Sequence, residues 1–212
     1  MKPLPISGLY AITPQYADVD VLLDQVRQAL QGGARAVQYR DKSQDVALRF
    51  EQASELLGLC RDFAVPLIIN DDLRLADLVG ADGVHLGRDD VSLREARLIL
   101  GRDRIIGVSC YNDLSLAHAA QDGGADYVAF GSFFASPTKP HAVAAPLELL
   151  RQAKRELRVP LVAIGGITLA NAGLLIEAGA DALAVISAVF DSGSIRTTAS
   201  EFAQLFSKPT LH

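Results

Sequence analysis

Short apolar segments and longer amphipathic segments alternate along the whole chain. The apolar segments are rich in β-branched residues, whereas the amphipathic ones place apolar residues at the three- and four-residue spacings of helices. Parallel strands that are covered on both faces have such near-continuous apolar sequences. Helices are expected between the strands, for example at Val19–Leu30, Val46–Phe63 and Ala170–Ala178, which gives eight βα units. The expected strands are Leu9–Thr13, Ala36–Arg40, Leu67–Asn70, Gly83–Leu86, Ile105–Ser109, Tyr127–Gly131, Leu161–Gly165 and Ala182–Ser187.

A repeated dipeptide supports a closed arrangement of these units. The pair Gly-Ala precedes each even-numbered strand, where glycine can end the preceding helix in a left-handed conformation. Two odd-numbered strands start instead with Val-Pro, at Val65-Pro66 and Val159-Pro160. A period of two βα units favours an α/β fold of the closed (β/α)8 type, a TIM barrel, over the alternative of an open sheet. No linker interrupts the pattern, so we expect residues 1–212 to form a single domain. The Gly-Ala pairs stand at 33–34, 80–81, 124–125 and 179–180.

Composition excludes several classes of partner. The chain has 20 Lys and Arg against 25 Asp and Glu, a net charge of −5 without a basic block, which argues against binding to nucleic acid or an anionic membrane. No apolar run approaches the roughly 20 residues that cross a bilayer, and the N-terminus lacks an apolar signal core. We therefore expect a soluble cytoplasmic protein with a small-molecule partner, and a homo-oligomer stays open. The two cysteines, Cys60 and Cys110, form no C-x-x-C pair and are expected to be reduced thiols; catalysis by Cys110 is the minor alternative, because no nearby residue clearly serves as its base.

The sharpest polar cluster is Gln-Tyr-Arg-Asp-Lys, at the end of the second expected strand. If extension continues to Lys42, alternation places Gln38, Arg40 and Lys42 on one face. Arginine offers a fork for two phosphate oxygens and lysine a compact charge, so the face suits a multiply charged anion. The alternative is a solvated strand end in which Asp41 pairs with one of the cations. Active sites of barrels lie at the carboxyl ends of the strands, which favours the functional interpretation.

Two acidic clusters follow the next two strands, in Asn-Asp-Asp at 70–72 and Gly-Arg-Asp-Asp at 87–90. Asp72 is placed to cap the following helix, which leaves Asp71 as a candidate metal ligand. One of Asp89 and Asp90 could likewise cap the helix at Ser92–Leu100, which would leave the other spare. Two carboxylates from neighbouring strands, with substrate phosphates beside them, suit Mg²⁺, and the lack of a His or Cys partner makes Zn²⁺ a poorer match. Together with the cations, these residues predict a pyrophosphate site.

Phosphate-binding features also follow the last three strands. Gly165 and Gly166 after the seventh strand and the segment 185–188 after the eighth can expose backbone N–H groups before a helix. The loop at 136–141 carries hydroxyls and a lysine and is either a lid over phosphate or an ordinary surface loop. His85 is expected to be a satisfied residue inside the barrel, His118 and His212 are expected to be incidental, and His141 could touch a ligand.

The motifs together resemble those of thiamine phosphate synthase, a family of (β/α)8 enzymes, across essentially the whole chain. The matching segments are Gln-Tyr-Arg-Asp-Lys at 38–42, Asn-Asp at 70–71, His-Leu-Gly-x-x-Asp at 85–90, Gly-Val-Ser at 107–109, Thr-Lys-Pro at 138–140, Ile-Gly-Gly-Ile at 164–167 and Val-Ile-Ser-Ala at 185–188.

The resemblance implies a transferase that joins 4-amino-5-hydroxymethyl-2-methylpyrimidine diphosphate to 4-methyl-5-(2-phosphoethyl)thiazole and gives thiamine phosphate and pyrophosphate. It implies that Mg²⁺ is bound by Asp71 and Asp90. The catalytic residues would be Arg40, Lys42 and Lys139. The pyrimidine diphosphate would be held by Gln38, Arg40, Lys42, Asn70, Ser109 and Lys139, and the thiazole phosphate by Ser136, Thr138, Gly166, Ile186 and Ser187.

Two positions depart from the usual family pattern. Arg88 stands where glutamine is common, which adds a charge near the expected metal site. The loop reads Phe-Ala-Ser-Pro-Thr-Lys at 134–139, whereas Pro-Thr-x-Thr-Lys is common, so Ser136 keeps the hydroxyl and the proline at 135 is missing.

Competing functions make different demands on these residues. A thiazole tautomerase barrel has no need of the pairs Arg40/Lys42 and Asp71/Asp90, and a non-catalytic phosphate-binding barrel would tolerate the loss of the metal ligands. A sugar-phosphate isomerase would need a carboxylate or histidine base at a strand end, and none is prominent. The joint presence of both pairs favours the synthase.

Overall fold

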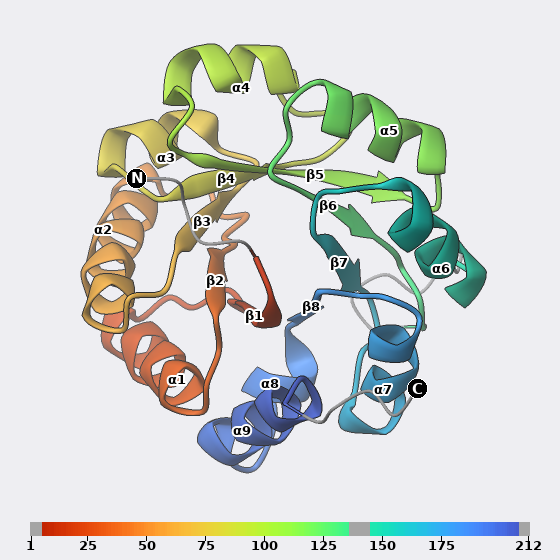
Figure 1. Ribbon diagram of the computed structural model, residues 1–212. Helices are drawn as coiled ribbons and strands as arrows, with labels where there is room; N and C mark the ends of the chain where they lie inside the picture. The colour runs from red at the N-terminus through yellow and green to blue at the C-terminus, as the bar shows by residue number, and fades with distance from the viewer. Residues whose placement is uncertain (1–5, 136–144, 208–212) are drawn as a thin grey trace.

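Eight parallel strands close into a barrel in the order in which they occur in the chain (Figure 1). The computed structural model describes residues 6–135 and 145–207. Each strand pairs with its neighbours in the sequence, and β1 pairs with β8 to close the ring. The prediction of a (β/α)8 barrel is therefore confirmed, and the open sheet is excluded. The strands are β1 (Gly8–Ile12), β2 (Ala36–Tyr39), β3 (Leu67–Asn70), β4 (Gly83–Leu86), β5 (Ile105–Tyr111), β6 (Tyr127–Phe130), β7 (Leu161–Ile164) and β8 (Ala182–Val185).

Helices surround the barrel on its outside, and two of them follow β8 (Figure 1). The last helix packs beside the first, and Gly32 permits this contact because a Cβ there would lie 2.5 Å from Cβ of Ala199. The helices are α1 (Val19–Gln31), α2 (Val46–Asp62), α3 (Leu73–Val79), α4 (Leu93–Leu100), α5 (Leu114–Asp122), α6 (Leu147–Glu156), α7 (Leu169–Glu177), α8 (Ser187–Phe190) and α9 (Ile195–Leu205).

The expected strand boundaries agree with the structure to within two residues. The two instructive differences lie next to the polar clusters. Strand β2 ends at Tyr39, so extension does not continue to Lys42, whereas β5 runs on past Ser109 to Tyr111. The pairing of β5 with β6 shifts register between Ser109 and Tyr111, an irregularity of the β-bulge kind.

The Gly-Ala pairs end helices as expected. Gly33, Gly80, Gly124 and Gly179 all have positive φ, between 73° and 109°, a conformation in which a residue with a side chain is strained. In three of the four cases an aspartate follows the alanine and accepts a hydrogen bond from the first or second residue of the preceding strand. Asp82 accepts from Leu67, Asp126 from Ile106 and Asp181 from Leu161, over 2.8–2.9 Å. The repeat thus fastens neighbouring strands at their amino ends.

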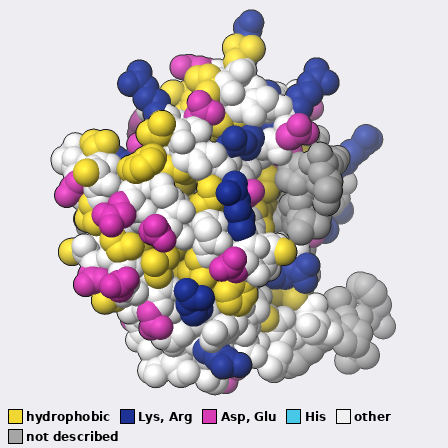
Figure 2. All heavy atoms as spheres, turned by 90° about the vertical axis from the view of Figure 1, so that its left-hand side faces the viewer, with side chains coloured by type: hydrophobic (Ala, Val, Ile, Leu, Met, Phe, Trp, Pro, Cys, Tyr) yellow, Lys and Arg dark blue, Asp and Glu magenta, His cyan; other side chains and the backbone are white. Residues whose placement is uncertain are grey.

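The core has two parts. The larger lies between the strands and the helices, and the smaller fills the inside of the barrel with residues such as Tyr10, Ile68, Tyr127 and Val162. The surface around this core mixes charges: on the face shown in Figure 2, Lys and Arg side chains lie among Asp and Glu side chains without a basic patch. Within the described ranges, no helix is long and apolar enough to cross a membrane.

Candidate active site

The carboxyl ends of the strands open into a cavity of about 830 Å³. Its lining comes from the ends of the strands and from the loops that follow them. Every site residue expected from the sequence that falls in the described part of the chain lies in this lining. These residues are Gln38, Arg40, Asn70, Asp71, Asp90, Lys42, Ser109, Gly166, Ile186 and Ser187. Ser136, Thr138, Lys139 and His141 lie outside the described residues.

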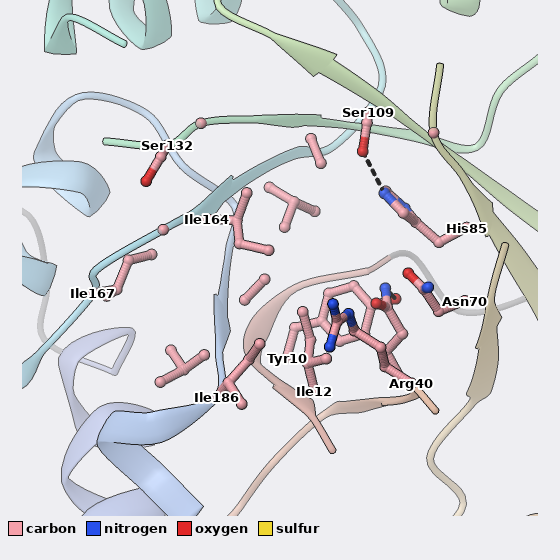
Figure 3. Close-up of a pocket in the computed structure, with 18 of the residues that line it drawn as sticks. Tyr10, Ile12, Arg40, Asn70, His85, Ser109, Ser132, Ile164, Ile167 and Ile186 are labelled. Carbon is pink, nitrogen blue, oxygen red and sulfur yellow. Dashed lines mark hydrogen bonds between the residues drawn. The ribbon is translucent and has the colours of Figure 1, made fainter. Parts of the chain in front are cut away.

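The cationic side of the cavity is built at the end of β2. Gln38 is buried inside the barrel, and its amide donates a hydrogen bond to the Tyr10 hydroxyl over 2.9 Å. The backbone N–H of Arg40 donates to the Thr13 hydroxyl over 3.0 Å, which fixes the chain where the strand ends. Figure 3 shows the Arg40 guanidinium inside the cavity. Lys42 reaches the same cavity from the loop, so the shared face comes from the course of the loop rather than from continued extension.

A carboxylate pair lies beside these cations. Lys42 forms an ion pair with Asp71, a residue with a φ of 63° directly after β3. Burial raises the pKa of Asp71, but hydrogen bonds from Lys42 and Asp90 outweigh burial and hold it below its usual value. Burial also raises the pKa of Asp90; the backbone N–H of Gly87 opposes this, and the neighbouring Asp71 carboxylate adds to it. The two carboxyls thus behave unequally: Asp71 is held ionised, and its charge opposes the ionisation of Asp90, an effect that a cation bound at the pair would relieve.

The donor set fits Mg²⁺. Asp71 and Asp90 come from successive strands and face one cavity with Asn70. In the part of the chain that the structure describes, no group of three or more His, Cys, Asp or Glu side chains is arranged to hold a metal. Mg²⁺ commonly takes one or two carboxylates and completes its octahedron with water and substrate phosphates, whereas structural Zn²⁺ needs four protein ligands.

Two helices, α3 and α4, begin near the Asp71 and Asp90 carboxyls, and the expected cap is found only at α3. Asp72 caps α3, accepting from Leu75 N over 2.9 Å, and it also pairs with Arg49 at 2.6 Å. The expectation that Asp89 or Asp90 caps α4 was wrong. Ser92 caps that helix, because it directly precedes the first helical residue and its hydroxyl accepts from Glu95 N over 3.2 Å.

The opposite side of the cavity consists mainly of backbone and apolar side chains, together with the side chains of Ser132, Thr168, Ser187 and Asp191. Gly165 and Gly166 have φ of 101° and 62°, and a Cβ on Gly166 would lie 2.5 Å from the Ala135 carbonyl oxygen. Only glycine allows this close passage. Ile186 and Ser187 stand where β8 passes into α8. Figure 3 shows Ile186 on the side of the cavity away from the polar residues.

The buried residues Tyr10 and His85 line the cavity, and Tyr127 lies within hydrogen-bond distance of both; none of the three was identified as a site residue from the sequence, although His85 was expected to be satisfied inside the barrel. The hydroxyls of Tyr10 and Tyr127 are 2.9 Å apart, and Tyr127 also lies 2.9 Å from Nδ1 of His85. Nε2 of His85 lies 2.8 Å from the Ser109 hydroxyl (Figure 3). Burial lowers the His85 pKa to about 4, although Asp71 opposes the shift, so the imidazole is neutral near pH 7. The sequence feature that could have identified these residues is a tyrosine or histidine inside an otherwise apolar strand.

The cysteines are free and buried, as expected for reduced thiols. The pKa values of Cys60 and Cys110 are both raised to about 12. Burial is the main cause, and a nearby aspartate adds to it, Asp82 for Cys60 and Asp113 for Cys110. Neither sulfur is therefore a thiolate near pH 7, which removes the basis for nucleophilic catalysis by Cys110.

The fold and the cavity define a (β/α)8-barrel protein that holds cations, carboxylates and glycine-rich backbone around one small-molecule site. Comparison with known proteins gives the particular family. The family model described as thiamine monophosphate synthase matches residues 9–189. A thiamine-phosphate synthase of Thiobacillus denitrificans is 62% identical over 206 residues, which cover 97% of each chain. One of Nitrosospira multiformis is 54% identical over 98% of this chain and 88% of the relative.

A solved structure agrees with these relatives. Thiamine phosphate pyrophosphorylase from Pyrococcus furiosus superimposes with a TM-score of 0.83 at 35% identity, covering 94% of this chain and 95% of that chain. This chain belongs to the thiamine monophosphate synthase family. It is a transferase with thiamine phosphate synthase activity.

Proposed function

We propose that the two sides of the cavity bind the two substrates of thiamine phosphate synthesis. The cationic side would take the pyrimidine diphosphate, and the glycine-rich side the thiazole phosphate. One observation carries the proposal: a single cavity has cations and a carboxylate pair on one side and glycine-rich backbone on the other. Each side suits one phosphorylated group, so the two rings would meet between them.

The leaving group is the part of the reaction that needs the most charge stabilisation. Arg40 and Lys42 would contact the diphosphate directly, and Asn70 would orient it. Asp71 and Asp90 would hold Mg²⁺, which when bound supplies positive charge beside the departing pyrophosphate. Lys42 is now paired with Asp71, so a cation at Asp71 would release the ammonium group to the phosphate oxygens.

The reaction we propose is a dissociative substitution. The bond between the pyrimidine methylene carbon and the diphosphate oxygen breaks, and its electron pair leaves with pyrophosphate. The aminopyrimidine ring stabilises the cation that remains, and the lone pair of the thiazole nitrogen forms the new C–N bond. No proton needs to be removed by the protein. This agrees with the state of His85 and Cys110, because the first has both ring nitrogens engaged in hydrogen bonds and the second is a protonated thiol.

The remaining residues would position the rings. Gln38 and Ser109 line the cavity and would contact the pyrimidine substrate. The backbone at Gly166, Ile186 and Ser187 would hold the thiazole phosphate through N–H groups. The family resemblance adds Ser136 and Thr138 to this phosphate site, and Lys139 to the leaving group. Holding both substrates aligned supplies much of the rate enhancement, because it removes the entropic cost of their encounter.

The test is to mix both substrates with Mg²⁺ and to follow thiamine phosphate and pyrophosphate together. Both products should appear in equal amounts. Lys42→Ala should lower kcat by about a hundredfold, the cost typical of removing one electrostatic contact from a transition state.

Lys154→Ala is the matched control. Lys154 is an exposed lysine in an ion pair with an aspartate, Asp181, but that pair lies at the amino end of the barrel. This variant should keep the wild-type rate. An equal rate in Lys42→Ala and Lys154→Ala would contradict the role of Lys42, and the formation of thiamine phosphate without pyrophosphate would contradict the reaction.

A further inference from the structure

A chain of hydrogen bonds crosses the inside of the barrel and ends at the cavity. It joins five side chains, each from a different strand, and four of these side chains are almost fully buried. The final residue, Ser109, lines the cavity. The links are Gln38 to Tyr10 at 2.9 Å, Tyr10 to Tyr127 at 2.9 Å, Tyr127 to His85 Nδ1 at 2.9 Å and His85 Nε2 to Ser109 at 2.8 Å.

The donor in each of these hydrogen bonds can be assigned by starting from Gln38. The Gln38 amide nitrogen can only donate, so the Tyr10 oxygen accepts and its proton goes to Tyr127. The Tyr127 proton then goes to Nδ1 of His85. A neutral imidazole has one N–H, which is therefore on Nε2 and points at the Ser109 oxygen. The Ser109 hydroxyl proton is left to point into the cavity.

The opposite direction leaves a buried proton without an acceptor. If Ser109 donated to Nε2, the proton on Nδ1 would go to Tyr127, whose own proton would go to Tyr10. The Tyr10 oxygen would then accept twice, and its proton would have no acceptor among the partners found in the described residues. Tyr10 is only 1% exposed, so water does not compensate for the loss.

The aromatic rings in this series of hydrogen bonds are packed against one another. The rings of His85 and Tyr127 stack with centroids 5.6 Å apart, and Tyr10 meets Tyr127 edge-on at 6.0 Å. Gly107 makes room for the central phenol, since a Cβ at this position would lie 1.9 Å from the Tyr127 ring. The Gly-Val-Ser motif on β5 thus has a physical role at both ends, with Gly107 admitting the phenol and Ser109 receiving the imidazole N–H.

We propose that His85 and Tyr127 are positioning residues that fix Ser109 as a hydrogen-bond donor to the bound pyrimidine diphosphate. The proposal rests on the proposed function, because it takes that substrate as the ligand beside Ser109. The complementary group is an acceptor, either an unprotonated ring nitrogen or a phosphate oxygen, and an N–H group of the ligand does not fit there. His85 and Tyr127 thereby set the hydrogen-bonding polarity of the cavity through Ser109, which is the group that meets the substrate.

The first test needs no substrate. The ¹⁵N chemical shifts of the His85 imidazole distinguish its two neutral tautomers, and His85→Gln assigns the resonances. In the wild-type protein near pH 7 we expect the proton on Nε2. A proton on Nδ1 would overturn the proposal while leaving the synthase activity untouched.

The second test compares two buried phenols. Tyr127→Phe removes the donor to Nδ1, so His85 is no longer held in one tautomer, and kcat/KM for the pyrimidine diphosphate should fall by about tenfold, the worth of one good hydrogen bond. Tyr10→Phe leaves Tyr127 free to donate to His85 and should cost less than about threefold. A purely structural role for the phenols predicts similar losses in both, and that result would overturn the proposal.

A double-mutant cycle with Ser109→Ala completes the test. If Tyr127 acts through the Ser109 hydroxyl, Tyr127→Phe should cost nothing further once that hydroxyl is absent. Losses that multiply fully in the double variant would overturn the proposal. Full activity in Ser109→Ala would also overturn it, and the synthase reaction itself would still stand, whereas absence of thiamine phosphate from the wild-type assay would instead defeat the proposed function.

Discussion

Aspartates occur at both ends of this barrel, but in opposite circumstances. At the amino end, Asp126 accepts a hydrogen bond from Ile106 N and pairs with Arg97 at 2.7 Å, and Asp181 does the same with Leu161 N and Lys154. Each of these carboxylates is satisfied by the chain. At the carboxyl end, Asp71 lies beside the Asp90 carboxyl; among the described residues, Lys42 is the cation paired with Asp71, and Asp90 accepts a hydrogen bond from Gly87 N.

We propose that the difference separates residues that hold the fold from residues that act on a ligand. A carboxylate with a backbone N–H and a cation for partners stabilises the folded state. At the carboxyl end burial and the ionised Asp71 raise the pKa of Asp90, so the second negative charge is disfavoured in the fold, and we propose that the pair serves to bind a cation. The same residue type therefore has opposite effects on stability and activity at the two ends, and variants can separate those effects.

The largest expected effect is on activity at the carboxyl end. Asp71→Asn should lower kcat/KM by about a hundredfold or more, because it removes half of the proposed Mg²⁺ site. The free energy of unfolding should fall by less than about 1 kcal/mol, since Asn loses only the partly exposed ion pair with Lys42. Steady-state kinetics and urea unfolding measure the two quantities on one sample.

Asp181→Asn is the counterpart at the amino end. It keeps an acceptor for Leu161 N but loses the charge opposite Lys154, so activity should stay at the wild-type level. Equal losses of activity in Asp71→Asn and Asp181→Asn would break the distinction between the two ends.

A moderate effect on stability is expected at Asp126. Asp126→Ala leaves the Ile106 N–H unsatisfied and removes the partner of Arg97, which should cost about 2 kcal/mol of unfolding free energy. Asp126→Asn, which keeps the acceptor, should lose less. Chemical denaturation gives both values, and an unchanged midpoint in Asp126→Ala would show that the repeat does not fasten the strands.

The smallest effect is a pH dependence that originates at His85. Its pKa falls from 6.5 to about 4 on folding, so below pH 6.5 the unfolded chain binds more protons and stability declines as the pH falls towards 4. Between about pH 7 and pH 5.5 the loss amounts to roughly 1 kcal/mol. Denaturation of the wild type and of His85→Gln at both pH values isolates this contribution. Equal pH dependence in the two proteins would place the histidine pKa near its unfolded value.

The barrel was predictable from the sequence because its strands are short, buried on both faces and separated by Gly-Ala turns. The candidate site clusters were found because polar residues such as Lys42 and Asp71 are conspicuous after apolar strands. The position of Lys42 on the same side as Arg40 was right for a different reason from the one expected, since β2 ends at Tyr39 and the loop carries the lysine back.

The buried chain of hydrogen bonds was not predictable in the same way. When both faces of a strand are buried, periodicity does not distinguish the inside of the barrel from the helix-facing side, so Tyr10 and Tyr127 read as ordinary core residues. Their contact also depends on Gly107, a residue 20 positions before Tyr127 that matters only once β5 and β6 are side by side. Similarly, two aspartates before a helix suggested a cap, but the serine next to the helix provides it.

The central claim is that the carboxyl-end cluster binds pyrophosphate together with Mg²⁺. Titration calorimetry of pyrophosphate into the wild type, Lys42→Ala and Lys154→Ala, each with and without Mg²⁺, tests this claim directly. We predict binding that Mg²⁺ strengthens, an affinity at least about tenfold weaker in Lys42→Ala, and no change in Lys154→Ala. Equal affinity in all three proteins, or binding indifferent to Mg²⁺, would contradict the account.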